Sequence, residues 1–592
     1  MPAKNTFLKQ LLIWRYKNIS DDNFLYIISI IVGLFAGLGA VIIKNLTFIL
    51  SLLSDNKYIS TYYREFYFIT PVIGFLIVVF ISKNILKSKV GHGIPMALGS
   101  LSKHDGRMNA KNIFSSMITA PITVSFGGSV GLEGPSVATG ASIASNVAGV
   151  FRLKSKTRKL LLVCGAAASL SAIFKAPIAA ILFAIEVFSL DLTLASLLPL
   201  LLASIAAVFT RLLFLGEQYI LDFHSIENFN IKNILYFIAF GVFTGAISLY
   251  FTKSYIFIEE NIKSIKNDYK KAAFAGICVG ILVFVAHPLY GEGFEFMNNL
   301  ILNNTEALKL DFIVFNFIEN KWIFLGFILF LILLKPIATS LTLNGGGVGG
   351  IFAPTLFLGV VTGNFYTKFL NIFDIQLPES NFAMLGMAGL LAGILQAPLT
   401  AIFLIAEITG GYGLIIPLML VVSVSFGISK KYVDHNIYTR QLKKNNQLVT
   451  HNKDQTVLML LNLKPLIETQ FIAVNPEMTF KEMLHTAVAK SNRNLFPVIE
   501  NENKLVGIIT LDDIREFMFD ENSQKKLRVK YFMHQPPDFI DIDVDNVSTV
   551  IQKFQRTEAW NLPVVKEGAY IGFISKSKLL TAYRNKLIEL TV

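Results

Sequence analysis

The stretch GAAASLSAIFKAPIAAILFAIEV at residues 165–187 recurs in pattern as GMAGLLAGILQAPLTAIFLIAEI at residues 386–408. In both copies a glycine lies 12 residues before the proline of an Ala-Pro pair, and a glutamate follows that proline by nine. A glycine-rich loop precedes each copy, GGSVGLEGPS at 127–136 and GGGVGGIFAPT at 345–355. Duplicated membrane segments interrupted by glycine and proline indicate a transport site between two halves of one protein. The repeat therefore predicts a two-halved transporter or channel.

The composition supports a membrane protein. The 592 residues are 53% hydrophobic and only 16% charged, with a mean hydropathy of +0.55, which is too apolar for a soluble domain of this size. Apolar stretches long enough to span a bilayer lie, beside the two repeated blocks, near 24–53, 66–82, 195–214, 234–252, 272–289, 322–343 and 413–427. Many are interrupted, so we expect an all-α polytopic membrane protein with broken helices of unequal length and tilt.

The charges indicate orientation rather than a nucleic-acid partner. The net charge of +12 is dispersed over loops and the C-terminal part, with no compact basic domain. A basic cluster within residues 430–444 follows the last apolar segment and predicts a cytoplasmic C-terminus. The two cysteines, Cys164 and Cys278, lie in apolar surroundings and indicate neither a disulfide framework nor a metal site.

The chain is predicted to have three parts. Residues 1–20 are expected to form an uncleaved amphipathic segment at the cytoplasmic surface. Residues 21–446 form the membrane domain, with halves at roughly 21–215 and 230–446. From residue 447 to 592 the apolar runs shorten to strand length and charges become frequent, which predicts a small cytoplasmic α/β domain.

The predicted cytoplasmic domain is itself repeated. NLFPVIENENKLVGIITLDDI at 494–514 and WNLPVVKEGAYIGFISKSKLL at 560–580 each suggest strand, polar turn, strand and helix. This pattern resembles a tandem pair of CBS domains, which we place at roughly 462–520 and 530–592. The resemblance implies a regulatory module that in several families binds adenine nucleotides.

In such modules a threonine and an aspartate after the second core strand often hold the nucleotide ribose. The first repeat offers Thr510 and Asp513, whereas the second has Ser575 and Lys578 and lacks the acidic partner. Asp513 has an alternative role as a cap of the helix that follows the strand. Nucleotide binding and purely structural coupling of the tail therefore both stay open.

Three glycine-rich breaks interrupt the apolar segments: GHGIP at 91–95, GLEGP at 131–135 and GGIFAP at 349–354. Each ends in a proline, which suits the first turn of a helix. Irregular backbone at membrane depth is tolerated only where it lines a cavity or is buried in protein. A helix that starts there directs free N–H groups and a positive dipole end inward. We therefore predict an anion site made of partial charges, which can replace hydration and still release the ion.

These motifs, in this order and spacing, resemble those of the CLC family of chloride channels and chloride/proton antiporters from about residue 20 to 445. The resemblance implies an inverted repeat, a chloride path through each subunit of a homodimer, and CBS domains as a known appendage. By position, Glu133 in GLEGP corresponds to the gating glutamate. An ionisable group at membrane depth is by default functional. The anion-binding candidates implied by position are His92, Gly93, Ile94, Gly134, Ile351, Phe352 and Tyr438.

The chain departs from the family pattern at two positions. His92 stands where the family commonly has a serine, so imidazole protonation could affect conduction, or the ring could be turned away from the ion. Val187 follows Glu186 at the position of the family's internal proton-carrying glutamate, and an uncharged residue there resembles channel-type members. Glu133 and Glu186 are the proton-path candidates, although Glu186, like Glu407, could be only a buried partner for backbone groups.

The leading hypothesis is passive or weakly proton-coupled chloride transport gated by Glu133, with chloride/proton antiport as the alternative. A fluoride/proton exchanger and a CBS-linked membrane sensor are weaker rivals. No zinc spacing, Walker loop or nucleophile triad supports an enzyme. The expected partners are chloride, lipid and a second copy of the chain, with no nucleic acid, no metal and no required cofactor. The few cysteines and the lack of an organelle address favour a bacterial inner membrane.

Overall fold

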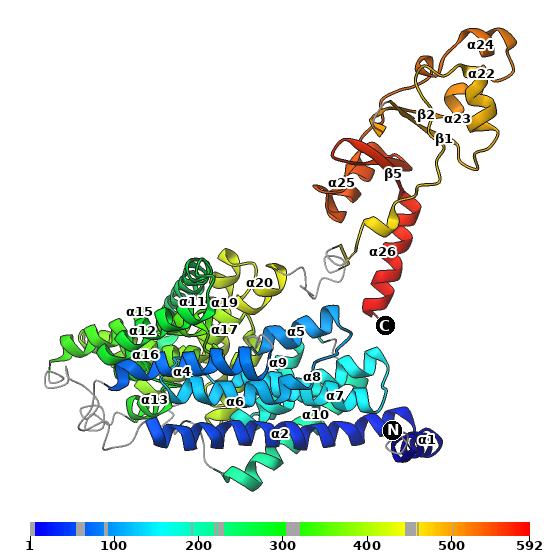
Figure 1. Cartoon of the computed structure of the whole chain (residues 1–592). Coiled ribbons are helices and arrows are strands. Elements are labelled where there is room, and N and C mark those ends of the chain that lie inside the picture. Colours follow the sequence, from blue (N-terminus) through cyan, green and yellow to red (C-terminus); the bar gives the residue numbers. More distant parts are fainter. Residues whose placement is uncertain are drawn as a thin grey trace. The chain divides into compact units, whose positions relative to one another are not determined.

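The computed structural model describes residues 6–54, 66–87, 93–190, 193–217, 221, 230–302, 320–444, 457–458, 461–500 and 503–591. The chain divides into two compact units, Met1–Gln447 and Leu448–Val592 (Figure 1). The first is a helical membrane unit, and the second is a small α/β tail. Each unit is considered by itself.

The membrane unit contains two consecutive runs of helices. The first run comprises α2 (Asp21–Ser54), α4 (Phe66–Phe80), the π-helix η2 (Ile81–Ile85), α5 (Ile94–Lys103), α6 (Lys111–Ser125), α7 (Glu133–Val150), α8 (Ser155–Phe174), α9 (Pro177–Glu186) and α10 (Leu194–Leu215). The second run comprises η3 (Ile231–Asn233), α11 (Ile234–Ile262), α12 (Asp268–Val285), η4 (His287–Leu289), α13 (Phe294–Ile301), α15 (Lys321–Gly345), α16 (Phe352–Asn371), α17 (Glu379–Leu395), α18 (Pro398–Ile408) and α19 (Ile415–Tyr432). The short helix α20 (Ile437–Lys444) follows.

Seven helical segments among the described residues are long and apolar enough to cross a membrane. They are Asp21–Leu52, Phe66–Ile85, Ser155–Phe174, Leu194–Leu215, Ile231–Ile262, Lys321–Gly345 and Ile415–Lys443. Helices α7, α12 and α16 have 18, 18 and 20 residues but do not combine this length with sufficient apolarity. The remaining helices of both runs are shorter, as expected for a membrane fold built from interrupted helices.

Packing within the two runs is equivalent. Helix α2 packs on α8 and α10 as α11 packs on α17 and α19, and α7 packs on α8 as α16 packs on α17. Across the two runs, α4 meets α12, α9 meets α18, and α7 meets α16. In each of these cross-contacts a helix meets its own counterpart, which is the arrangement that a two-fold relation between the halves produces.

The glycine that opens each repeated stretch sits at a tight helix crossing. A Cβ atom on Gly165 of α8 would lie 2.3 Å from the carbonyl oxygen of Gly140 on α7. A Cβ atom on Gly386 of α17 would lie 2.2 Å from the carbonyl oxygen of Gly359 on α16. Only glycine permits backbones to approach this closely. The repeated glycine therefore sets the distance between the two central helices of each half.

The Ala-Pro pairs mark a second shared feature, the break between two helices. The residues that directly follow α8 and α17 are Lys175 and Gln396. Both adopt the left-handed conformation, with φ values of 61° and 56°. The next helices start at the prolines, Pro177 and Pro398, whose missing N–H is not needed at that position. Each repeated stretch thus folds as a helix, a sharp turn and a second, shorter helix.

The segment before the first span forms helix α1 (Thr6–Asn18). The basic side chain of Arg15 is buried, whereas Ile13 and Trp14 are 48% and 58% exposed. The placement of residues 1–20 as an amphipathic segment at the cytoplasmic surface stays a prediction.

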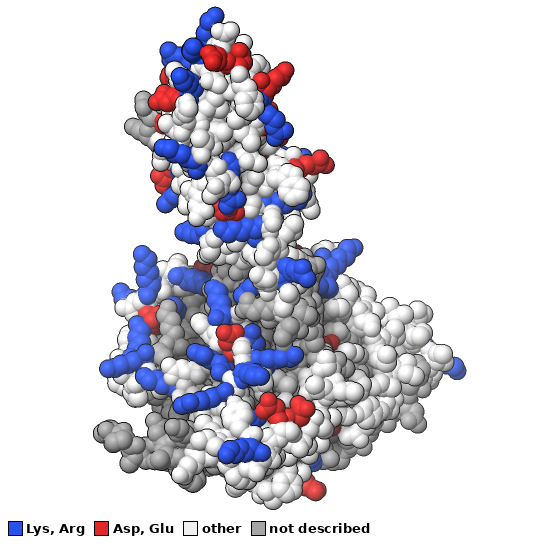
Figure 2. Space-filling model, turned by 90° about the vertical axis from the view of Figure 1, so that its right-hand side faces the viewer, with Lys and Arg blue, Asp and Glu red and all other residues white. Residues whose placement is uncertain are grey.

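Basic side chains gather on one face of the membrane unit, next to a broad surface that is almost free of charge (Figure 2). The loops between α5 and α6 and between α7 and α8, with the helix ends beside them, carry the exposed residues Lys103, Arg107, Lys111, Arg152, Lys154 and Lys156. The two loops lie together, because the Ser155 hydroxyl donates to Asp105 over 3.0 Å and Lys159 pairs with Asp105 at 3.3 Å. The wide uncharged surface is suited to contact with lipid.

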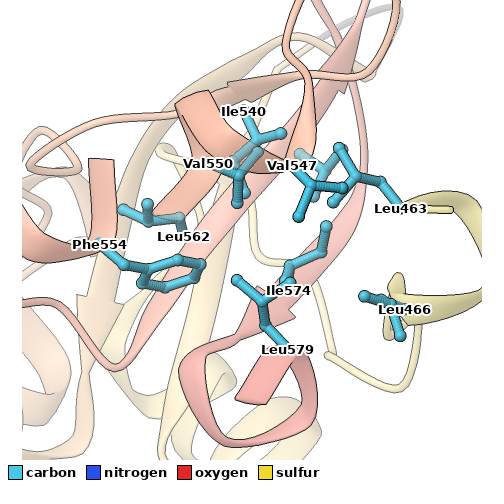
Figure 3. Packing of buried hydrophobic residues seen from close by; sticks show 10 residues of the cluster. Leu463, Leu466, Ile540, Val547, Val550, Phe554, Leu562, Ile574 and Leu579 are labelled. Atoms are coloured by element: carbon cyan, nitrogen blue, oxygen red, sulfur yellow. The ribbon is translucent and has the colours of Figure 1, made fainter. Parts of the chain in front are cut away.

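The tail contains two similar sheets with short helices. Its elements are η6 (Lys464–Leu466), α22 (Phe480–Met483), η7 (Leu484–Val488), β1 (Leu495–Ile499), β2 (Leu505–Thr510), α23 (Leu511–Ile514), α24 (Glu521–Lys526), η9 (Val529–Tyr531), β3 (Ile540–Asp541), α25 (Val547–Thr557), β4 (Asn561–Lys566), β5 (Ala569–Ser575) and α26 (Lys576–Thr591). β1 and β2 pair antiparallel, as do β4 and β5, and β3 lies parallel to β4. One repeat encloses a core of Leu463, Leu466, Ile540, Val547, Val550, Phe554, Leu562, Val564, Ile574 and Leu579, most of them labelled in Figure 3.

The two tail repeats exchange short segments. Glu468, which precedes the β1–β2 hairpin of the first repeat, and Phe573 of β5 exchange two backbone hydrogen bonds with N to O distances of 2.7 and 3.0 Å. His534, which precedes the β4–β5 hairpin of the second repeat, and Ile508 of β2 do the same, at 2.9 and 3.0 Å. Each sheet is therefore extended by a short backbone segment that precedes, in the sequence, the hairpin of the other repeat.

Candidate anion site

Three helix starts meet at the centre of the membrane unit, and glycine lets them do so. Gly93, the residue before α5, has a φ of 57°, and a Cβ atom there would lie 2.4 Å from the carbonyl oxygen of Gly134 on α7. A Cβ atom on Gly350 would lie 2.9 Å from the nitrogen of Gly134. Gly131 and Gly350 exchange two backbone hydrogen bonds of 2.9 and 2.8 Å. The loops before α7 and α16 are thereby joined, with the start of α5 beside them.

The first amides of these three helices are not capped by a side chain of the preceding residue. By contrast, the starts of α9 and α18 are capped across the two halves. Glu407 accepts from the amides of Ile178 and Ala179 at 3.0 and 2.8 Å. In return, Glu186 accepts from the amides of Leu399 and Thr400, both at 2.8 Å, and from the Thr400 hydroxyl at 2.6 Å. The chain thus supplies carboxylates to the first amides of α9 and α18, whereas Gly93, Leu132 and Ile351 provide no side-chain cap for α5, α7 and α16. The Glu292 carboxylate beside these starts reaches the amide of Leu132 ahead of α7, which leaves the following amides to a mobile anion.

Glu133 is the first residue of α7, and its carboxylate lies among the open helix starts. The residue is 1% exposed, and neither carboxylate oxygen has a hydrogen-bond partner among the described residues. A Cβ atom on Gly131 would lie 2.0 Å from Oε2, and one on Gly350 would lie 3.6 Å from it. The carboxylate is therefore folded back onto the joint between the α7 and α16 loops. It occupies a place that an anion could take.

In the second half, Phe352 stands where the first half has Glu133, as the first residue of α16. Its ring packs against Phe174 and Phe183, with centroid distances of 5.4 and 6.2 Å. The residue before it, Ile351, is also buried. The side chains of this helix start belong to an apolar cluster, so its free amides are what it can offer to an anion.

Tyr438 lies on α20, which packs against α5 and α17. It is 5% exposed, and its hydroxyl has no hydrogen-bond partner among the described residues. Tyr438 is close enough to both Glu133 and Tyr255 to interact with them electrostatically. An unpaired buried hydroxyl normally has a water or an ion as partner. Of the remaining sequence candidates, Ile94 and Gly134 lie at the joined helix starts, and His92 lies outside the described residues.

Sequence reasoning missed a group of charges beside the gate candidate. The carboxylate of Glu292, in the loop before α13, accepts a hydrogen bond of 3.1 Å from the amide of Leu132. Lys44 on α2 and Lys335 on α15 both interact electrostatically with Glu292. Lys335 is fully buried, and its ammonium lies 4.3 Å from the centre of the Phe357 ring. Charged residues within apolar spans were the available signal.

A cavity of about 430 Å³ opens beside this charge group. It is lined by Lys44, Asn45, Thr47, Phe48, Ser51, Leu132, Arg211, Leu215 and Glu292. A second cavity of about 240 Å³ lies between α11, the end of α15 and α20, the helix that carries Tyr438. The described residues of the chain contain no cluster of three or more groups that could hold a metal ion.

In the tail, Asp513 is engaged by its own helix start. Its Oδ2 atom accepts from the amide and the hydroxyl of Thr510 at 2.6 and 2.7 Å, which forms a capping box at α23. His534 lies 3.1 Å from the same oxygen. Ser575, at the corresponding place in the second repeat, donates instead to Glu468 over 2.8 Å.

The geometry can now be compared with known proteins. The family model for the voltage gated chloride channel matches residues 73–430, more than half of the chain. The chain belongs to this family. CBS domain models also match residues 463–520 and 529–585. The prediction of a CLC membrane domain with a C-terminal CBS pair is thus confirmed.

Individual CLC relatives are distant but cover much of the chain. Chloride channel protein CLC-e of Arabidopsis thaliana is 26% identical over 503 residues, covering 76% of this chain and 68% of the relative. A slow cyanobacterial Cl⁻/H⁺ antiporter has a TM-score of 0.60 at 23% identity, covering 71% of this chain and 97% of the other. A eukaryotic CLC transporter has a TM-score of 0.59 at 15% identity, covering 97% and 99%. These structures show the shared fold: the all-α polytopic membrane architecture with a small α/β tail is confirmed.

Proposed function

We propose that this protein transports chloride across the membrane along a path past the open starts of α5, α7 and α16, and that Glu133 is the gate. The observation that carries the proposal is the contrast in helix caps. Glu186 and Glu407 bond to the first amides of α18 and α9, whereas the residues that precede the three joined starts provide no side-chain cap, and Glu292 bonds to the amide of Leu132 ahead of α7. A site of partial charges binds an anion without the permanent hold of a lysine or arginine.

The gate works by competition between a carboxylate and an anion. In this conformation the Glu133 carboxylate lies at the joint of the α7 and α16 loops, and its oxygens have no side-chain hydrogen-bond partner in the part of the chain that the structure describes. Protonation removes its charge, and an arriving chloride repels it, so both favour a swing of the side chain out of the path. The amides of Ile351, Phe352 and Gly134 and the hydroxyl of Tyr438 are then proposed to coordinate the ion.

Passive or weakly coupled transport is the first candidate. Val187 provides no carboxylate, and Glu186 is held by three hydrogen bonds from α18, which leaves it poorly suited to carry protons. The second candidate is chloride/proton antiport. It is favoured by Glu259, a further buried carboxylate that lines the cavity between α11 and α20.

Purified protein in liposomes tests both the proposed chloride transport and the choice between passive transport and antiport. Chloride efflux that exceeds the efflux from protein-free vesicles supports anion transport, and its absence contradicts it. In Glu133→Gln, which cannot carry charge, we expect chloride flux to become independent of pH. Reversal potentials under opposed chloride and pH gradients separate the two candidates, because a potential that follows chloride alone contradicts antiport.

Two features of the assembly belong to the same proposal. We place the basic loops after α5 and α7, and with them both chain termini, on the cytoplasmic side, because cytoplasmic loops carry an excess of lysine and arginine. By resemblance to the family, we propose a homodimer with one path in each subunit, which chemical cross-linking in membranes can test.

Adenine nucleotide binding at Thr510 and Asp513 stays a prediction. Titration calorimetry of the wild type against Thr510→Ala tests it.

A further inference from the structure

The cavity between α11, α15 and α20 has a polar lining inside the membrane unit. Its volume is about 240 Å³. Its polar and charged lining residues include Tyr255, Glu259, Lys263, Asn344, His435 and Arg440. Ile437 and Gln441, the neighbours of Tyr438 on α20, also line it, so this cavity adjoins the helix that carries the buried tyrosine.

Glu259 is the buried acid of this cavity. Its side chain is 11% exposed, and its Oε1 atom lies 2.6 Å from the ammonium of Lys263, one helical turn further on. The side chain of Lys263 is 58% exposed. The carboxylate is therefore inside the protein while its partner reaches into water. Glu259 lies in the last turn of α11, at the end of the helix that reaches water, so protons from solution have access to this cavity.

Tyrosine side chains connect this acid to the gate. Tyr255 lies four residues before Glu259, so both side chains are on one face of α11. Tyr255 lines the cavity together with Asn344, at the end of α15, and with Ile437 and Gln441, which flank Tyr438 on α20. Tyr438 is close enough to both Tyr255 and Glu133 to interact with them electrostatically. The buried Tyr438 hydroxyl has no hydrogen-bond partner among the described residues, so a water bound to it would continue this row of polar groups.

We propose that Glu259 takes up protons from water in this cavity and delivers them, by way of Tyr255 and Tyr438, to Glu133. The inference rests on the proposed gating role of Glu133. In one cycle, Glu259 accepts a proton from water and its ion pair with Lys263 opens. The proton then moves along hydroxyl groups and water to the Glu133 carboxylate, which releases it on the opposite side. Glu259 is again ionised at the end, so the protein is unchanged.

The charged groups around Glu259 set the conditions for this step. Lys263 faces it from α11, while His435 and Arg440 line the same cavity from the segment after α19 and from α20. Arg440 is paired with Glu260, at 2.9 Å. The cations Lys263 and Arg440 attract the Glu259 carboxylate, so Lys263 has to move aside when the proton arrives. Its exposed, flexible side chain can do this without disturbing the helix.

The test is the ratio of proton to chloride flux in liposomes that contain the full-length protein. In Glu259→Gln we expect chloride-driven proton movement to fall to the background of protein-free vesicles. Asp374→Asn is the control, since it neutralises an exposed acid that does not line the cavity, and it should keep the wild-type ratio. A wild-type ratio in Glu259→Gln overturns the proposal.

Two further results keep the outcomes distinct. If the wild type moves chloride but no protons, the role of Glu259 is wrong while the proposed anion transport stands; if it moves neither, the proposed function itself fails. Should Glu259→Gln not fold, Lys263→Met answers the question, because it retains the acid and removes its partner. We then expect the pH of half-maximal proton flux to rise. An unchanged value contradicts the proposal.

Discussion

At the scale of single residues, Gly131 decides where the Glu133 carboxylate lies. A Cβ atom on residue 131 would be 2.0 Å from Oε2 of Glu133 and 2.8 Å from the Cβ of Ala353. These separations are far below any van der Waals contact. The absent side chain of Gly131 therefore creates the space in which the carboxylate rests.

Replacing this glycine should act on the gate. In Gly131→Ala the added methyl group displaces the Glu133 carboxylate, so we expect faster chloride flux at neutral pH and a weaker dependence on pH. Flux measured at acid and neutral pH checks this. Gly149→Ala is the control, because a Cβ atom there meets nothing within 4 Å and should leave flux unchanged. Slower flux in a correctly folded Gly131→Ala protein would contradict the expectation.

The sequence predicts the gate candidate but not its surroundings. Glu133 stands in the local motif GLEGP, and the resemblance of that motif to the CLC family implies its role. Glu292, Lys44 and Lys335 come from three distant parts of the chain and meet only through the packing of α2, α15 and the loop before α13. Each was visible only as a charge in or beside apolar sequence. Glu259 was likewise visible in the sequence only as a charge beside apolar residues.

At the scale of helices, each half of the membrane unit caps a helix of the other. Glu186, at the end of α9, accepts three hydrogen bonds from the start of α18, and Glu407, at the end of α18, accepts two from the start of α9. These bonds satisfy amides that have no acceptor within their own helix. The repeated pattern in the sequence predicts the two glutamates but cannot show that they exchange partners.

Loss of either carboxylate should weaken the junction between the halves. A hydrogen bond to a charged group contributes about 2 kcal/mol, so we expect Glu186→Gln and Glu407→Gln both to lower the unfolding temperature. Glu186→Gln should have the larger effect, because Glu186 has the additional bond from the Thr400 hydroxyl. Thermal unfolding in detergent measures the difference. When Thr400→Val is added to both glutamine variants, most of the difference between their unfolding temperatures should disappear. Equal unfolding temperatures for Glu186→Gln and Glu407→Gln without it would contradict the expectation.

At the scale of the whole molecule, the two units were predictable from composition, yet the exchange of segments within the tail was not. Strand patterns predict both hairpins, and β1, β2, β4 and β5 lie where the sequence suggests. The bridges of Glu468 to Phe573 and of His534 to Ile508 involve single residues in irregular backbone. Such short pairings leave no periodic signal in a sequence.

The tail should lose part of its stability in acid. Hydrogen bonds from Lys530 and then from Arg528 hold the pKa of Glu477 below its usual range. A lowered carboxylate pKa contributes stability above the ordinary glutamate pKa, about 4.3, and that contribution is lost as pH falls through the folded-state pKa. We therefore expect the protection factor of the Lys530 amide, its exchange rate relative to the intrinsic rate at the same pH, to fall below this range. Glu477→Gln should abolish this pH dependence, whereas Glu521→Gln should retain it.

The exchange of caps between the halves also has a consequence for biosynthesis. Translation produces α9 more than 200 residues before Glu407 exists, so the amides of Ile178 and Ala179 have no carboxylate when the first half enters the bilayer. An uncapped helix start is unfavourable in lipid, where no water can replace the missing acceptor. The first half is therefore incomplete until the second arrives. Insertion of the nascent chain and maturation of the transport path must be separate events in time.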